Sequence, residues 1–183
     1  MSQPRSTLLD ACAVVSLYAS RRMADILGAV PTPCAIVDVV EREAQYVLKG
    51  GTNDDARERE PVALGEIIAG GIVSIAAAAA DEELATYILL TERLNRGEAM
   101  TAAVAIHRGY AVVTDDRKAE RVLGELGVPL RSTLDLVKAW FDGDQLDAAI
   151  QRQVLLDIRQ RGTYKPPKRH PLRSWWDGVM SVG

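Results

Sequence analysis

The chain is poor in the residues that usually build disulfide frameworks, zinc sites and nucleophile-based active sites. Among its 183 residues are two cysteines, Cys12 and Cys34, and two histidines, His107 and His170. Both cysteines stand in apolar surroundings, so we interpret them as small buried hydrophobic residues. The wide spacing of the four residues argues against a zinc site, and we find no Ser/His/Asp arrangement or nucleophilic cysteine motif.

Long apolar stretches and a large excess of charge of one sign are also missing. The longest apolar stretch, residues 72–80, is too short to cross a bilayer, and the N-terminus lacks the pattern of a secretory signal. We therefore expect a cytoplasmic protein that does not associate with membranes. The net charge of −3 says little about partners, because an acidic site in a nucleic-acid enzyme would itself contribute negative charge.

The apolar residues that are present favour a parallel sheet covered by helices. With only one Phe, the apolar mass consists mainly of Ala, Val, Leu and Ile, which suits strands buried on both faces. Strands and helices alternate in the predicted order, which is typical of the α/β class with a parallel sheet. The expected strands are 7–9, 34–37, 72–75, 110–113 and 128–131, and the expected helices are 13–27, 38–48, 81–94, 98–107, 117–126, 133–141 and 144–160.

Local signals set some of these boundaries. Asp38 and Glu41 have the spacing of a capping box, and Gly50-Gly51 is expected to close the helix 38–48. Gly97 is expected to break the chain between two helices, and Ser132 to cap the helix that follows it. The polar stretch 52–61 predicts a surface loop.

Acidic residues stand at the edges of several apolar runs, and these carry the functional hypothesis. They are Asp10, Glu43, Glu98 and the pair Asp115-Asp116. In parallel sheets the active site lies at the carboxyl ends of the strands, where Asp10 and the Asp pair are expected. Converging carboxylates repel one another unless a cation joins them, and a hard divalent cation prefers oxygen ligands. Such cations can activate water and stabilise the leaving oxygen of a phosphodiester.

Each of these acids also has a purely structural interpretation. Asp10 and either residue of the Asp115-Asp116 pair could cap a helix, and Glu98 in a first helical turn is favoured by the helix dipole alone. Glu41 and Glu43 point in different directions on a helix, so one of them is expected to face the site, and we favour Glu43. Asp115 and Asp116 both remain candidates.

Four segments of the sequence together resemble PIN-domain ribonucleases, over about residues 6–140. They are Leu8-Leu9-Asp10-Ala11, Arg42-Glu43-Ala44, Gly97-Glu98-Ala99 with Ala102-Ala103, and Thr114-Asp115-Asp116-Arg117-Lys118-Ala119. The resemblance implies a three-layer α/β/α sandwich and hydrolysis of RNA. It also implies Mg²⁺ or Mn²⁺ held by Asp10, Glu43, Glu98 and by Asp115, Asp116 or both. Thr114 is expected to hydrogen-bond a ligand carboxylate or water.

The resemblance also implies partners. Bacterial and archaeal members are often toxins of toxin–antitoxin pairs and often dimers, so an antitoxin and a homodimer are expectations. This chain is longer than a typical toxin of that kind, and many relatives carry Asp where it has Glu98. We divide it into a nuclease domain, residues 1–142, and a C-terminal helix with a basic, aromatic tail, residues 143–183.

The tail has two interpretations. Its basic residues stand among aromatic ones, a pattern that suits contacts with RNA phosphates and bases. Alternatively, Trp175 and Trp176 dock on the body or on a second subunit, which we slightly favour because exposed Trp pairs usually find a partner surface. The basic residues concerned are Arg161, Lys165, Lys168, Arg169 and Arg173.

Two rival functions remain. A catalytically silent module could use the same cleft to bind RNA or a protein. A phosphotransfer fold is disfavoured, because Ala11-Cys12 follow Asp10 where an Asp-x-Asp nucleophile motif would need a second acid.

Overall fold

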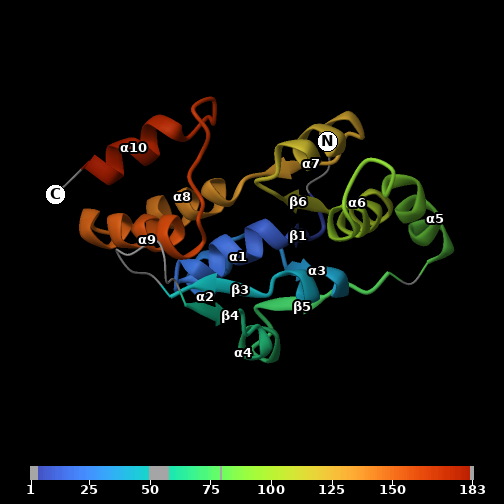
Figure 1. Ribbon diagram of the computed structural model, residues 1–183, viewed down its shortest axis with the longest axis horizontal. Helices are drawn as coiled ribbons and strands as arrows, with labels where there is room; N and C mark the ends of the chain where they lie inside the picture. The colour runs from blue at the N-terminus through green and yellow to red at the C-terminus, as the bar shows by residue number, and fades with distance from the viewer. Residues whose placement is uncertain (1–3, 50–57, 79, 182–183) are drawn as a thin grey trace.

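The computed structural model describes residues 4–49, 58–78 and 80–181, and a five-stranded parallel sheet forms its centre (Figure 1). Helices flank this sheet, which gives the three layers of an α/β/α sandwich and confirms the predicted fold class. The strand order is β5-β2-β1-β6-β7, with β1 in the middle. The strands are β1 (Thr7–Leu9), β2 (Cys34–Ile36), β5 (Val73–Ile75), β6 (Ala111–Val113) and β7 (Leu130–Arg131).

The helices lie on both sides of the sheet and beyond its ends. In Figure 1, α5 and α6 occupy one end of the molecule and α9 and α10 the opposite end. None of the described helices is long and apolar enough to cross a membrane. The helices are α1 (Ala11–Ala19), α2 (Met23–Gly28), α3 (Asp38–Glu43), α4 (Gly65–Ala69), α5 (Asp81–Leu90), α6 (Arg96–Arg108), α7 (Arg117–Glu125), α8 (Thr133–Asp144), α9 (Ala148–Arg161) and α10 (Arg173–Ser181).

The central strands end at a common edge because of their register. Leu9 pairs with Val113, and the Asp10 N–H donates to the Val113 carbonyl over 3.0 Å. Apart from Thr7, both strands consist of apolar residues, and all their side chains are buried, as expected of a parallel sheet covered on both faces. The residues that follow them, Asp10 and Thr114, therefore become neighbours although they are far apart in the sequence.

The predicted helix 38–48 is wrong beyond Glu43. Helix α3 ends there, and β3 (Tyr46–Leu48) pairs antiparallel with β4 (Arg59–Pro61) in a separate two-stranded sheet. Val47 is buried in this arrangement, so the strand, and not a further helical turn, removes the apolar side chain from solvent. The predicted loop 52–61 is thus a strand at its end, while residues 52–57 lie outside the described residues.

Three other local predictions also need correction. The helix 13–27 is two helices, because the chain turns at Arg21, which has a φ of 59°. The capping box does not form, since Asp38 lies inside α3 and its carboxylate accepts from Arg42 Nη2 over 2.9 Å. Gly97 lies in the first turn of α6, which is capped by Asn95, and so does not separate two helices.

The C-terminal segment packs on the body of the molecule. Helix α9 contacts α1, and α10 contacts α9. Trp176 is only 1% exposed, and the Trp175 ring lies 5.8 Å from that of Phe141, measured between centroids. The prediction that the two tryptophans dock on the body is confirmed.

Arg161 anchors this segment instead of contacting RNA. Its guanidinium is 4% exposed and donates to the Ala19 carbonyl and the Glu60 carboxylate, each over 2.9 Å. It thereby ties the end of α9 to the end of α1 and to β4. Arg173 is also engaged, by Asp177 at 2.6 Å and by the Pro166 carbonyl at 2.8 Å. Burial of Arg161 argues against its predicted RNA contact, whereas an RNA contact of Arg173 stays a prediction.

We expect Arg161→Met to lower the free energy of unfolding by about 2–3 kcal/mol, because the buried carbonyl and the Glu60 carboxylate both lose a charged donor. Arg159→Met on the same helix removes an exposed cation and should change stability by less than about 0.5 kcal/mol. Urea unfolding of both variants measures the difference. Equal effects would contradict the anchoring role.

Candidate metal centre

Asp10 follows the middle strand of the sheet, at the edge formed by the carboxyl ends of the strands. It follows β1 directly and caps α1, so its Oδ1 accepts from the Ala11 N–H over 2.6 Å. Its Oδ2 accepts from the Thr114 hydroxyl over 2.8 Å, and the residue is only 4% exposed. The strand pairing described above makes this contact possible, and it confirms the hydrogen bond predicted for Thr114.

Asp116 lies on the same side as Asp10 and caps α7. Its Oδ1 accepts from the backbone N–H groups of Lys118 and Ala119 over 2.8 and 2.9 Å. Its own N–H donates to the Thr114 hydroxyl oxygen over 3.2 Å. Thr114 therefore connects the two acidic residues, and the capping role foreseen for one member of the Asp pair belongs to Asp116.

Glu98 and Glu43 meet at the N-terminus of α6. Glu98 is the third residue of a capping box, in which its Oε2 accepts from the Asn95 N–H over 3.1 Å. Glu43 comes from the end of α3, and its Oε1 accepts from the Gly97 N–H over 3.1 Å. A Cβ at Gly97 would overlap Glu43 Oε2, so only glycine leaves room for the carboxylate there.

In addition to burial, the charge of a neighbouring carboxylate raises the pKa of Asp10, Glu43 and Glu98. Burial raises the pKa of Asp10, and the charge of Asp116 raises it further, while hydrogen bonds from Thr114 and Ala11 oppose the shift. Burial also raises the pKa of Glu98, to which the charges of Asp10 and Asp116 add. Burial raises the pKa of Glu43 too, with a smaller contribution from Asp10. Four acids from separate elements are thus concentrated at one edge, and folding disfavours the ionisation of Asp10, Glu43 and Glu98.

Asp115 points away from this cluster. Its Oδ1 accepts from the Thr133 N–H at the start of α8 over 3.0 Å, and the Tyr164 hydroxyl faces the same carboxylate. Burial raises the pKa of Asp115, and the hydrogen bonds from Thr133 lower it in part. Of the two adjacent candidates, the structure groups Asp116 with Asp10 and assigns Asp115 to the packing of α8 and the tail.

Cys12 separates the two acidic environments. Its Sγ lies 3.4 Å from Asp10 Oδ2 and accepts from the Asp115 N–H over 3.3 Å. Burial raises the pKa of the Cys12 thiol, and the charges of Asp10 and Asp115 raise it further, so it remains a neutral thiol. The predicted role of Cys12 as a small apolar filler is therefore incomplete, because the thiol also hydrogen-bonds within the site.

The donor set suits a hard divalent cation, although the side chains are not drawn together around one point. Among the described residues, no three His, Cys, Asp or Glu side chains are close enough to hold an ion as they stand. Glu43 and Glu98 are turned toward the backbone N–H groups at the start of α6. One oxygen each of Glu43, Glu98 and Asp116 makes no hydrogen bond within the described residues. Mg²⁺ needs few carboxylates and keeps several waters, so these oxygens fit its requirements.

Several features of the site were not predicted from the sequence, although one of them has a local sequence signal. Asn95 precedes Glu98 by three residues, so capping-box spacing could have identified it. The need for glycine at Gly97 arises only when α3 and α6 meet. The approach of Tyr164 to Asp115 has no local sequence signal, since these residues meet through the packing of the tail.

We expect Asp10→Asn to stabilise the metal-free protein at pH 7.5 by about 1 kcal/mol, because the change removes a buried charge. The amide oxygen can still accept from the Ala11 N–H, while the amide nitrogen donates to the Thr114 hydroxyl oxygen, which reverses the direction of that bond. The pKa of Asp10 is raised in the folded state, so wild-type stability rises as the pH falls through that raised pKa toward the ordinary value near 3.8. The difference in stability between Asp10→Asn and wild type should therefore narrow as the pH is lowered from 7.5 toward 4. Thermal unfolding of both proteins in EDTA measures this difference in stability. A variant less stable than wild type at pH 7.5 would contradict the expectation.

Comparison with known proteins assigns no family. No family model matches this chain, and no curated protein is significantly similar to it in sequence.

Proposed function

We propose that this protein is a metal-dependent endoribonuclease with a PIN-like active site. One observation carries the proposal: Asp10, Glu43, Glu98 and Asp116 come from four separate elements and lie near one another at the carboxyl edge of a parallel sheet. The burial of Asp10 and Glu98 and the repulsion between neighbouring carboxylates cost stability, which a bound cation would recover. A site of this kind is typical of phosphodiester hydrolysis, because the chemistry then needs no protein nucleophile.

In this proposal, the roles of the acidic residues differ according to how firmly each side chain is held. Asp10 and Asp116 are fixed by Thr114 and by helix caps, so they define where a cation binds. Glu98 and Glu43 have longer side chains, which can turn from the α6 backbone toward the same point. Bound Mg²⁺ or Mn²⁺ supplies a Lewis acid and lowers the pKa of a coordinated water. The neutral thiol of Cys12 keeps an additional negative charge out of the site.

A catalytically silent RNA- or protein-binding module is the second candidate. It is favoured by the hydrogen bonds that tie Glu43 and Glu98 to the backbone, which give each carboxylate one partner without a metal. Titration with Mn²⁺ by calorimetry distinguishes the two candidates. Binding that is lost in Asp10→Asn supports the enzyme, while no binding to the wild-type protein supports the silent module.

The proposed partners follow from the same resemblance. We infer an RNA substrate and a cytoplasmic location. An antitoxin and a homodimer stay predictions, because no contact or surface of the described residues distinguishes them from a monomeric nuclease.

Matched acidic variants test the catalytic assignment. We expect Asp10→Asn and Glu43→Gln to lower Mn²⁺-dependent cleavage of single-stranded RNA by about 100-fold or more, the scale of losing a group that stabilises developing charge. Glu41→Gln removes an exposed carboxylate from the same helix and should leave cleavage within about twofold of wild type. Undiminished cleavage by purified Asp10→Asn protein would refute the nuclease assignment.

Gly97 offers a second test of the same site. In Gly97→Ala, the new Cβ displaces the Glu43 carboxylate, so we expect Mn²⁺ affinity and cleavage to fall about tenfold or more. Stability should not fall, because Ala is the better helix former and the displaced group is a flexible side-chain end. Gly124→Ala in α7 introduces no close contact and should stabilise the protein without affecting cleavage. If both variants keep full activity, Glu43 has no part in the site.

A further inference from the structure

A cavity lies beside the candidate metal centre, between the start of α8 and the loop that precedes α10. Its volume is about 420 Å³, within the range of pockets that hold small molecules and large enough for one nucleotide. Thr114 lines the cavity and also bonds Asp10, so the cavity and the carboxylate cluster share a border. The tail forms one wall, which makes the cavity a product of the C-terminal segment docking on the sheet.

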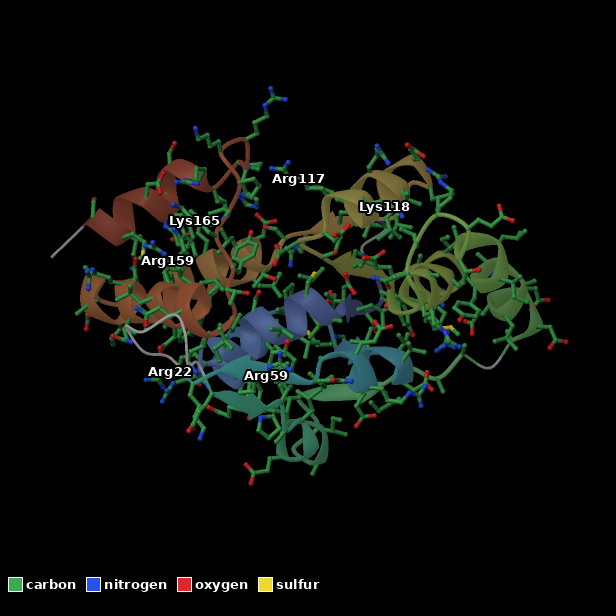
Figure 2. The ribbon with its side chains drawn as sticks, in the orientation of Figure 1. Arg22, Arg59, Arg117, Lys118, Arg159 and Lys165 are labelled. Carbon is green, nitrogen blue, oxygen red and sulfur yellow. The ribbon has the colours of Figure 1, made fainter. Side chains whose placement is uncertain are left out.

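Three guanidinium groups line this cavity, from three different elements. Arg117 begins α7, Arg131 ends β7, and Arg169 lies in the loop before α10. In Figure 2, Arg117 extends from α7 toward that loop. All three are exposed, and none makes a hydrogen bond or ion pair with another described residue. Within the described ranges, Arg161 and Arg173 of the tail are paired, whereas Arg169 is not.

Three carboxylates also line the cavity, those of Asp115, Glu120 and Asp135. Asp115 accepts from the Thr133 N–H, and Asp135 accepts from the Ser132 N–H over 2.7 Å and from its hydroxyl. These neutral donors orient the two carboxylates toward the start of α8 without removing their charge. Within the described part of the chain, no lining carboxylate forms an ion pair with a lining guanidinium. The three guanidinium forks therefore stay available, and their planar shape suits the oxygens of a phosphate.

The cavity also offers flat surfaces. Tyr164 and His170 line it, together with two prolines. The Tyr164 ring is held in place because it packs edge-on against buried Trp176, with 6.3 Å between centroids, and its hydroxyl faces Asp115. A fixed aromatic face next to guanidinium groups is the usual arrangement for a stacked base and its phosphate.

We propose that this cavity binds one nucleotide of a single-stranded RNA, with its phosphate on Arg117, Arg131 and Arg169 and its base against Tyr164. The inference rests on the proposed function, because the strand would continue from the cavity across Thr114 to the carboxylates. The tail then serves as a substrate-binding element, and the enzyme selects unpaired RNA because a paired base cannot enter the cavity.

Binding measured without catalysis tests this inference. A fluorescent single-stranded RNA of about ten nucleotides is titrated in EDTA with wild type, Arg131→Gln, Arg169→Gln and the double variant. Each single change should weaken binding about fivefold or more, and the double variant should reduce the slope of log affinity against log salt by about 1.4, or about 0.7 for each phosphate contact. Lys168→Gln, an exposed neighbour outside the cavity, is the control and should change affinity less than about twofold.

The outcomes separate this proposal from the nuclease assignment. Equal weakening by Lys168→Gln and Arg169→Gln would contradict the cavity and indicate a diffuse basic surface. Uridine monophosphate binding as tightly as the RNA would contradict a strand as the ligand. If the cavity variants lose RNA binding while no protein cleaves RNA, the nucleotide site stands and the nuclease proposal fails. Melting temperatures equal to wild type exclude misfolding as the cause.

Discussion

The parallel pairing of β1 with β6 is the constraint from which the rest of the site follows. It sets Leu9 against Val113, so that the next residue of each strand emerges at the same edge. Asp10 and Thr114 then come within hydrogen-bond distance, and Thr114 in turn receives the Asp116 N–H. A shift of one residue in this register would reverse the faces of both buried strands, so the core that stabilises the fold also fixes the position of the carboxylates.

The N-terminus of α6 supplies the other half of the site. Helix N-termini carry unpaired N–H groups and a partial positive charge, and both favour nearby carboxylates. Glu98 and Glu43 use this property, which lets them lie near Asp10 and Asp116 without a cation. The folded chain therefore tolerates a concentration of negative charge that burial alone would disfavour, and the same arrangement keeps two long side chains within reach of a metal.

Most of the sheet was predictable from the sequence, because its buried parallel strands are short, mainly apolar runs. The position of Asp10 at the carboxyl end of a strand was predictable for the same reason. The predictions from the sequence were wrong where tertiary contacts determine the local structure. Val47 favours a strand only because β4 is there to pair with it, and Gly97 resembles a helix break until Glu43 occupies the space beside it. Choosing Asp116 over Asp115 needed the start of α8, since only the folded chain shows that Thr133 engages Asp115. Arg161 resembled the other tail cations until burial distinguished it.

The most direct measurement is the anomalous X-ray signal of manganese in a crystal of this protein soaked in Mn²⁺. The account predicts a peak within coordination distance of Asp10 and Asp116, with Glu98 or Glu43 turned away from the α6 backbone toward it. Carboxylates that stay in their metal-free positions, with manganese absent from this edge of the sheet, would contradict it.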